Sequence, residues 1–239
     1  MIVGPLPFDR FAATAGELLA PDEPLSSASG YALMAVAALA AGDDAGFDEH
    51  EGRWRDLLDR HGMVWLAAAH GMEIAFVEIS VGKAEAAERR IREAREFFAA
   101  TGNLLYTSVA DEFLCEAVGE QDRPREFLRL ADAFGATVPI TDRQNLIKRQ
   151  LVLARAHLLR GAAPEAEAAS RRALKLVEPT DLVPDHANAL LVLAEVLDAR
   201  DLRDDATVAR NGAIAKLRVK GNLAAVARLE RRTRPALRR

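Results

Sequence analysis

The sequence has 239 residues, of which 50% are hydrophobic and 28% are charged, and its formal net charge at pH 7 is −4. This balance is typical of a soluble chain that buries a core, in one domain or two small ones. The single cysteine excludes a disulfide framework and a zinc site built on several thiolates. The longest unbroken apolar run, residues 31–41, is too short to span a membrane, and the first residues lack the pattern of a signal peptide. We therefore expect a cytoplasmic protein without a membrane segment.

Residues 1–26 are expected to form an N-terminal segment that precedes the main domain. Apolar residues recur at helical spacing over residues 8–20, which indicates a leading helix. Segment 21–29 contains two prolines and several small residues, and this composition predicts a loop.

A repeat of about 40 residues organises the rest of the chain. Its clearest marker is a turn-forming residue between two helical patterns, at spacings of 40, 40, 39 and 40. The five markers are Gly42, Gly82, Asp122, Gly161 and Asp201. Eight residues before each marker stands a large aliphatic residue, followed by a small one: Met34 and Ala35, Ile74 and Ala75, Leu114 and Cys115, Leu153 and Ala154, Leu193 and Ala194. The positions five and twelve residues after each marker are also apolar: Phe47 and Trp54, Ala87 and Ala94, Phe127 and Phe134, Ala166 and Ala173, Ala206 and Ala213.

This period predicts a helix, a short turn and a second helix in every copy. Small residues let paired helices approach closely, and a glycine marker ends the first helix in left-handed geometry. The second helices are expected to end at Gly62, Gly102, Gly135, Pro179 and Gly221. The five predicted pairs cover residues 27–62, 64–102, 104–135, 142–179 and 182–221, with a capping helix near 222–233. No segment shows the alternation of a strand, so we expect an all-α protein, a right-handed α–α superhelix over residues 27–233 with a basic tail at 234–239.

The pattern resembles tetratricopeptide repeats, with copies longer than the usual length of about 34 residues. Several segments resemble more particularly the helical-repeat tails of large bacterial signalling ATPases, which include adenylate or guanylate cyclase-like proteins and ATP-dependent transcriptional regulators. These segments are residues 82–89, 155–161, 180–182, 187–197 and 220–222. The resemblance implies a regulatory role. The chain has no Gly-x-x-x-x-Gly-Lys-Ser/Thr phosphate loop, so the sequence does not support nucleotide hydrolysis.

No catalytic, cofactor-binding or metal-ligating residues are predicted, and we expect a protein that is not an enzyme. The densest group of histidine and acidic residues, 48–51, opens a predicted helix, where the helix dipole favours acidic side chains. Cys115 occupies the small packing position of the third repeat, which is typical of a buried hydrophobic residue rather than of a nucleophile.

The resemblance to tetratricopeptide repeats also implies which residues line the concave face. The first helices form that face, chiefly through positions near each large–small pair. The residues so placed are Met72, Phe76, Leu151, Arg155, Leu191 and Glu195, with Lys148 and Asn188 nearby. An apolar strip interrupted by a few charges suits a helical or extended peptide, because hydrophobic contacts give affinity and charges fix direction. The alternative is that the long repeats tighten the groove, so that these side chains only pack.

Three functions follow from these patterns. The first is a non-catalytic interaction or regulatory module of a bacterial signalling or transcriptional-regulatory system, which binds a protein or peptide or packs on other domains of a longer chain. The second is an effector-sensing domain that closes around a small molecule. The third is nucleic-acid contact through the C-terminal helix, since residues 201–239 hold eleven basic and four acidic residues. No aromatic residue lies among these charges to stack a base, so a solvated, arginine-rich helix explains them more simply.

Overall fold

Twelve α-helices and no strand make up the part of the chain that the structure, a computed structural model, describes: residues 4–20, 22–137 and 143–233. The all-α prediction is confirmed. The helices are α1 (Phe8–Glu17), α2 (Pro24–Ala41), α3 (Asp44–His61), α4 (Val64–Val81), α5 (Ala84–Ala100), α6 (Leu104–Gly119), α7 (Pro124–Thr137), α8 (Arg143–Leu159), α9 (Ala163–Val177), α10 (Val183–Ala199), α11 (Arg203–Lys220) and α12 (Leu223–Thr233).

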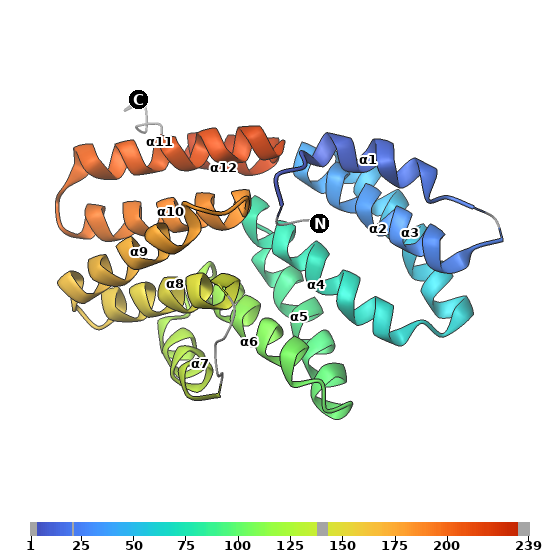
Figure 1. Cartoon of the computed structure of the whole chain (residues 1–239), viewed down its shortest axis with the longest axis horizontal. Helices are drawn as coiled ribbons and strands as arrows, with labels where there is room; N and C mark the ends of the chain where they lie inside the picture. Colours follow the sequence, from blue (N-terminus) through green and yellow to red (C-terminus); the bar gives the residue numbers. More distant parts are fainter. Residues whose placement is uncertain (1–3, 21, 138–142, 234–239) are drawn as a thin grey trace, which may run out of the picture.

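The helices from α2 to α11 form five pairs that follow one another along an arc (Figure 1). Each first helix packs on its own second helix and on the first helix of the next repeat, so that α2, α4, α6, α8 and α10 lie side by side. This stacking is expected because a single pair cannot bury its apolar face alone. The predicted superhelix of helix pairs is therefore confirmed.

The turn inside every pair contains one residue in left-handed geometry, and it is the predicted marker each time. The φ angles of Gly42, Gly82 and Gly161 are 84°, 94° and 75°. Asp122 and Asp201 adopt φ angles of 53° and 60°, which few residues other than glycine, asparagine and aspartate tolerate. The 40-residue period in the sequence is thus a period of left-handed turns.

The repeated small and apolar positions form the interior. Each of the five small residues that follow the large aliphatic is at most 1% exposed. The ten apolar residues at five and twelve positions after the marker are also buried. Alanine at these sites lets the paired helices meet closely, and the aromatic residues of the first and third repeats fill the wider gaps.

Several predicted boundaries differ from the observed ones; α9, for example, ends at Val177 and not at Pro179. Helix α2 begins at Pro24, so residues 24–29 are helical and not a loop. Proline breaks a helix interior but suits its first turn, where its missing N–H leaves no hydrogen bond unmade. Helix α7 continues through Gly135 to Thr137, and the leading helix α1 ends at Glu17 rather than at residue 20. The predicted tail at 234–239 lies outside the described residues.

The two ends of the array meet, which nothing in the repeat pattern indicates. Figure 1 shows α11 running back toward the N-terminal helices and α12 beginning beside them, and α12 packs on α2 and α4. Asn222 Nδ2 donates to Ser80 Oγ at 2.9 Å, and Arg228 Nη1 donates to the carbonyl oxygens of Ile79 and Ser80. Lys220 is fully buried, and its ammonium donates to the carbonyl oxygens of Gly4 and Leu6 at 2.8 and 2.7 Å.

Two helices, α2 and α4, have the length and mean hydropathy (1.4 in each) of a membrane span. Both are first helices that lie between neighbouring repeats, and 56% and 39% of their residues are buried inside the fold. Core helices of this kind meet the same criteria, so the observation is weak evidence for a membrane. The cytoplasmic location stays a prediction.

Candidate functional site

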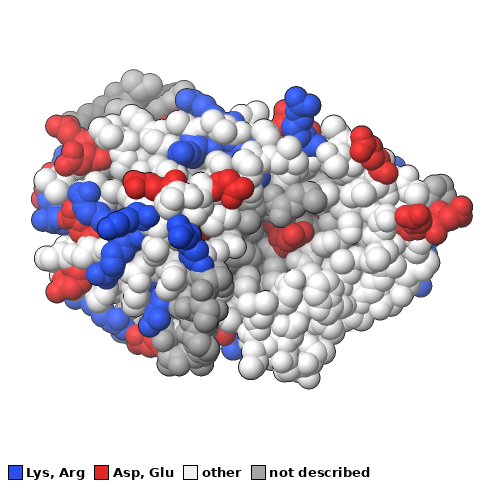
Figure 2. Space-filling model, in the orientation of Figure 1, with Lys and Arg blue, Asp and Glu red and all other residues white. Residues whose placement is uncertain are grey.

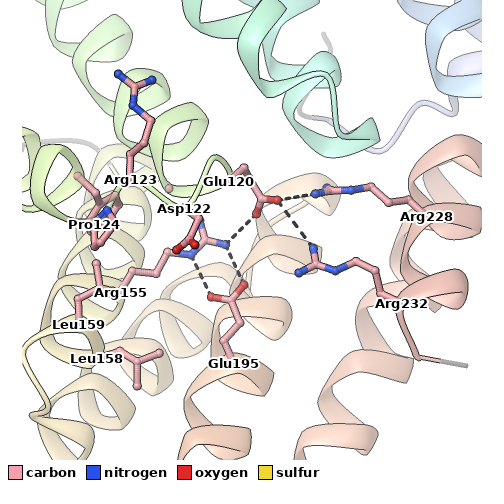
Figure 3. A pocket seen from close by; sticks show the side chains of 12 residues that line it. Glu120, Asp122, Arg123, Pro124, Arg155, Leu158, Leu159, Glu195, Arg228 and Arg232 are labelled. Carbon is pink, nitrogen blue, oxygen red and sulfur yellow. Dashed lines mark hydrogen bonds and ion pairs between the residues drawn. The ribbon is translucent and has the colours of Figure 1, made fainter. Parts of the chain in front are cut away.

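A cleft of about 490 Å³ opens where the end of α6 faces α8, α10 and α12, and we call it the charged cleft (Figure 3). Its polar side chains are those of Glu120, Asp122, Arg123, Arg155, Glu195, Arg228 and Arg232. In the space-filling view, charged side chains of both signs crowd the part of the surface formed by α8–α12 (Figure 2).

Arg155 of α8 lies between the two carboxylates of the charged cleft. Its Nε and Nη2 donate to the two oxygens of Glu195 at 3.1 and 3.2 Å, and Nη2 lies 3.7 Å from Glu120 Oε1. Burial lowers the pKa of Arg155, but the charge and hydrogen bonds of Glu195 and the charge of Glu120 outweigh it and hold the pKa above its ordinary value. The guanidinium therefore remains charged in a fixed orientation.

Glu120, directly after α6, is shared by three arginines. Arg228 Nη2 donates to Glu120 Oε2 at 2.6 Å, and Arg232 Nη1 lies 3.9 Å from the same oxygen. Burial raises the pKa of Glu120, but Arg155, Arg228 and Arg232 together hold it below its ordinary value. Of the two charges that α12 brings here, only that of Arg228 is held closely, because Arg232 is 65% exposed. An anionic group that enters the cleft could pair with Arg232 without displacing Glu120.

Beneath the charged cleft, a small inner cavity of about 100 Å³ lies against α4, α10 and α12. Five of the eight residues predicted for the groove border this cavity: Phe76, Arg155, Asn188, Leu191 and Glu195. The structure thus gathers side chains from the second, fourth and fifth repeats around one space. The resemblance to tetratricopeptide repeats had assigned these residues to the concave face, because the corresponding positions of each first helix lie on its inward face.

The other three predicted groove residues are almost fully buried. Lys148, Leu151 and Met72 are 1%, 2% and 4% exposed. Leu151 belongs to the core between α8, α9 and α10, and Met72 packs in the core of the second and third repeats. The long first helices lie close enough together that Lys148 and Leu151 fill the space between repeats, whereas Met72 also lines a separate hollow on α4 and α6.

Lys148 is the centre of an ionic cluster that joins three repeats. Its Nζ lies 2.8 Å from Glu112 Oε1, 3.2 Å from Asp185 Oδ1 and 3.7 Å from Glu116 Oε1. Asn188 Nδ2 donates to Glu116 Oε1 at 2.7 Å. Burial raises the pKa of Glu112 to about 8, and the neighbouring Glu116 and Asp185 add to this effect against the opposing charge of Lys148. The cluster holds the first helices of repeats three, four and five together.

Glu120, Arg228 and Arg232 are site residues that the sequence analysis missed. The arginines fall in the C-terminal region interpreted as solvent-facing, which is wrong for Arg228, whose side chain is 22% exposed and paired. One signal was available: Arg228 and Arg232 stand four residues apart on one helix face, and like charges at that spacing repel unless an acidic group lies opposite.

The single thiol and the half-buried imidazole of His70 do not show reactive chemistry. Cys115 is fully buried, and burial raises the pKa of its thiol to about 12, so that the nucleophilic thiolate is disfavoured. Burial lowers the pKa of His70 to about 4, and Trp54 Nε1 donates to His70 Nδ1 at 3.3 Å. In the described ranges no group of three or more histidine, cysteine or acidic side chains is arranged to hold a metal ion.

Comparison with known proteins yields a similarity of structure only. No family model matches the chain, and no curated protein matches it. Among solved structures, a Rap protein complexed with Competence and Sporulation Factor superposes with a TM-score of 0.69 at 11% sequence identity. The match covers 93% of this chain and 62% of the Rap chain, so this chain spans less than two thirds of the length of the Rap chain. The fold is a tetratricopeptide-like helical repeat.

Proposed function

We propose that this chain is a non-catalytic binding module whose ligand, a segment of another protein, lies in the charged cleft. The observation that carries the proposal is the convergence of Arg155, Arg228 and Arg232 with Glu120 and Glu195, from three helices and the turn after α6, around one open space. Such a set presents acceptors for a segment's N–H groups and a partly free cation for a carboxylate. The charges therefore fix the direction of a bound segment, and the neighbouring apolar side chains of Leu158 and Leu159 add affinity.

The experiment is affinity capture from native lysate followed by mass spectrometry, with the wild-type chain and the double variant Arg155→Ala/Glu195→Ala. This variant removes both members of a pair, so neither is left without its counter-charge. A specific partner captured by the wild type should be reduced at least tenfold with the variant. The matched control is Arg53→Ala/Glu49→Ala, which removes an exposed pair on α3 and should leave capture unchanged. Equal capture by all three proteins would overturn the proposal.

The size of the charged cleft also favours a second candidate, a small anionic effector. The cleft volume falls within the range of about 300–1,000 Å³ that is usual for small-molecule sites. Native mass spectrometry of the purified protein separates the two: a bound metabolite that disappears in Arg155→Ala/Glu195→Ala, with no protein partner, would favour the effector.

The regulatory setting rests on the sequence resemblance to the helical-repeat tails of bacterial signalling ATPases, and we propose it on that basis alone. Capture of a nucleotide-binding or transcription-related protein would support this setting. Nucleic-acid contact through α12 is disfavoured, because Arg228 is committed to Glu120 and to two carbonyl oxygens of α4.

A further inference from the structure

The charged cleft and the inner cavity share a border that consists of charged side chains alone. Five residues line both spaces: Glu120, Arg155, Glu195, Arg228 and Arg232. Their side chains converge from α8, α10, α12 and the turn after α6 (Figure 3). A molecule that extends from the charged cleft into the inner cavity therefore passes these charges.

Apolar side chains from α1, α4, α10, α11 and α12 form most of the wall of the inner cavity on the other side of this border. The largest of them are Phe8, Phe76, Ile79, Leu191, Leu217 and Leu229. The two connected spaces thus differ in chemistry, because one is polar and the other is mainly apolar.

The polar side chains in the wall of the inner cavity already have partners. Ser80 Oγ donates to a backbone carbonyl of α4 at 2.7 Å and accepts from Asn222 Nδ2 at 2.9 Å. Asn222 Oδ1 accepts from a backbone N–H of α12 at 3.2 Å, and Glu116 Oε1 accepts from Asn188 Nδ2 at 2.7 Å. A polar ligand group would have to displace these contacts, whereas an apolar group leaves them intact.

Lys220 also borders the inner cavity, but its ammonium is enclosed. Its Nζ donates to the carbonyl oxygens of Gly4 and Leu6 and lies 4.7 and 4.8 Å from the ring centroids of Phe8 and Phe11. The residue is fully buried. An anion would reach this ammonium only by displacing the N-terminal segment.

Arg232 is the cation of the shared border that remains available to a ligand. Arg155 is bonded to both oxygens of Glu195, and Arg228 is bonded to Glu120 and to two backbone carbonyls. Arg232, in contrast, is 65% exposed, and its Nη1 lies 3.9 Å from Glu120 Oε2, which is beyond hydrogen-bond distance. An anionic group at the mouth of the inner cavity can therefore pair with Arg232.

The volume of the inner cavity limits the apolar part of such a ligand. The cavity measures about 100 Å³. An apolar protein cavity of about 150 Å³ binds benzene, which has six carbons, so about four carbons fit here in proportion. The ligand is thus small, with a short apolar chain at one end.

We propose that the two spaces form one site for a small aliphatic carboxylate, whose chain fills the inner cavity while its carboxylate pairs with Arg232. A neutral molecule would lack the pair with Arg232, and a wholly polar anion would leave the apolar wall unused. This inference rests on the second candidate function, the small anionic effector, and names its chemical class. It does not depend on a bound protein segment.

The test is a titration of the wild-type protein with straight-chain carboxylates from acetate to octanoate, followed by NMR of methyl groups. Each added methylene should strengthen binding about fourfold, which corresponds to about 0.8 kcal/mol. The gain should stop near pentanoate, whose chain has about the four carbons that the cavity holds. The methyl resonances of Ile79 and Leu191 should shift. Equal affinities for acetate and pentanoate, or no shift at these methyls, would overturn the proposal.

The role of the carboxylate is tested with pentanamide, which has nearly the same shape as pentanoate but no charge. Pentanoate should bind at least tenfold more tightly than pentanamide to the wild type, but less than threefold more tightly to Arg232→Gln. The matched control is Arg231→Gln, an exposed arginine on the same helix, which should keep the wild-type preference. The same preference in the wild type and in Arg232→Gln would contradict the proposed pair.

The role of the inner cavity is tested with Leu191→Phe, which places a larger side chain in its wall. This variant should weaken pentanoate binding at least tenfold. The matched control is Leu223→Phe, at an exposed position of α12 that lines neither space, and it should bind as the wild type does. Undiminished binding by a folded Leu191→Phe would show that the chain lies elsewhere.

The failure of this inference can be told apart from failure of the protein-segment proposal. Capture of a partner that depends on Arg155 and Glu195, without any binding of pentanoate, would overturn this inference and leave the protein segment supported. Binding of pentanoate that depends on Arg232, without any captured partner, would support this inference and overturn the protein segment.

Discussion

At the scale of single residues, the most informative feature is the left-handed residue at each turn. Glycine accepts this geometry without strain, whereas an L side chain in the left-handed region costs about 1–2 kcal/mol. Asp122 and Asp201 bear that cost in the third and fifth repeats, with φ angles of 53° and 60°. The backbone requirement is therefore the same in all five repeats, although the residue that meets it differs.

Replacement of Asp201 by glycine is expected to stabilise the protein. Glycine removes the left-handed strain from the folded state, but it also makes the unfolded chain more flexible, which costs free energy on folding. The first effect exceeds the second by about 0.5–1 kcal/mol. Urea denaturation should show this gain as a higher midpoint with an unchanged slope. The reverse change, Gly161→Ala, is a matched test because nothing lies near an added Cβ and the φ angle is 75°, so only strain changes. It should lose about 1 kcal/mol. A destabilised Asp201→Gly would contradict this account.

At the scale of helices, the ionic cluster around Lys148 links α6, α8 and α10 through groups fully removed from water. Three carboxylates face one ammonium, so the fold favours a proton on Glu112. Its pKa in the fold, about 8, lies above the ordinary value of 4.5. Stability from this proton is fully present below the unfolded pKa and is lost as the pH rises through the folded pKa.

We therefore expect the free energy of unfolding of the wild type, measured relative to that of Glu112→Gln, to decrease between pH 5 and pH 8 by a few kcal/mol. The opposing contribution of His70, whose pKa is lowered by burial, is present in both proteins and cancels in this difference. Glutamine has nearly the shape of the protonated acid and still offers an oxygen to Lys148, but it has no proton to lose. Urea denaturation across this pH range gives the comparison. Glu93→Gln, on an exposed face, should retain the wild-type slope. Parallel slopes for the wild type and Glu112→Gln would show that Glu112 does not hold the proton.

At the scale of the whole molecule, contacts between the two ends of the array close the interior. Arg228 is central to them, because one guanidinium bonds the end of α6 through Glu120 and the end of α4 through two carbonyl oxygens. The charged cleft and the inner cavity both include residues of α12, so both depend on this closure. An array of stacked pairs without it would present an open groove.

Arg228→Ala is expected to lower the free energy of unfolding by about 1.5–3 kcal/mol, the usual range for hydrogen bonds to charged groups. Hydrogen exchange should become faster in α12, while exchange in α8 and α9 stays as in the wild type. The control is Arg231→Ala, an exposed residue of the same helix, which should change neither measurement. If both variants exchange alike, Arg228 does not hold α12 in place.

The sequence by itself determined the repeat, the helix pairs and the identity of the buried faces. These features are local: a left-handed turn, a small contact residue and apolar spacing each act within about 20 residues of chain. The resemblance to tetratricopeptide repeats likewise depends on positions within one helix, and it assigned to the concave face five residues that border the inner cavity, among them Arg155 and Glu195.

Only the tertiary structure decided how the repeats curve and which side chains remain accessible. The curvature sums small rotations between successive pairs, so one repeat does not reveal that α12 meets α4. Lys148 shows the consequence: its position on the inward face is set locally, but its burial depends on carboxylates 36 and 37 residues away, Glu112 and Asp185. Burial and pairing are properties of residues that meet in space, and local periodicity does not carry that information.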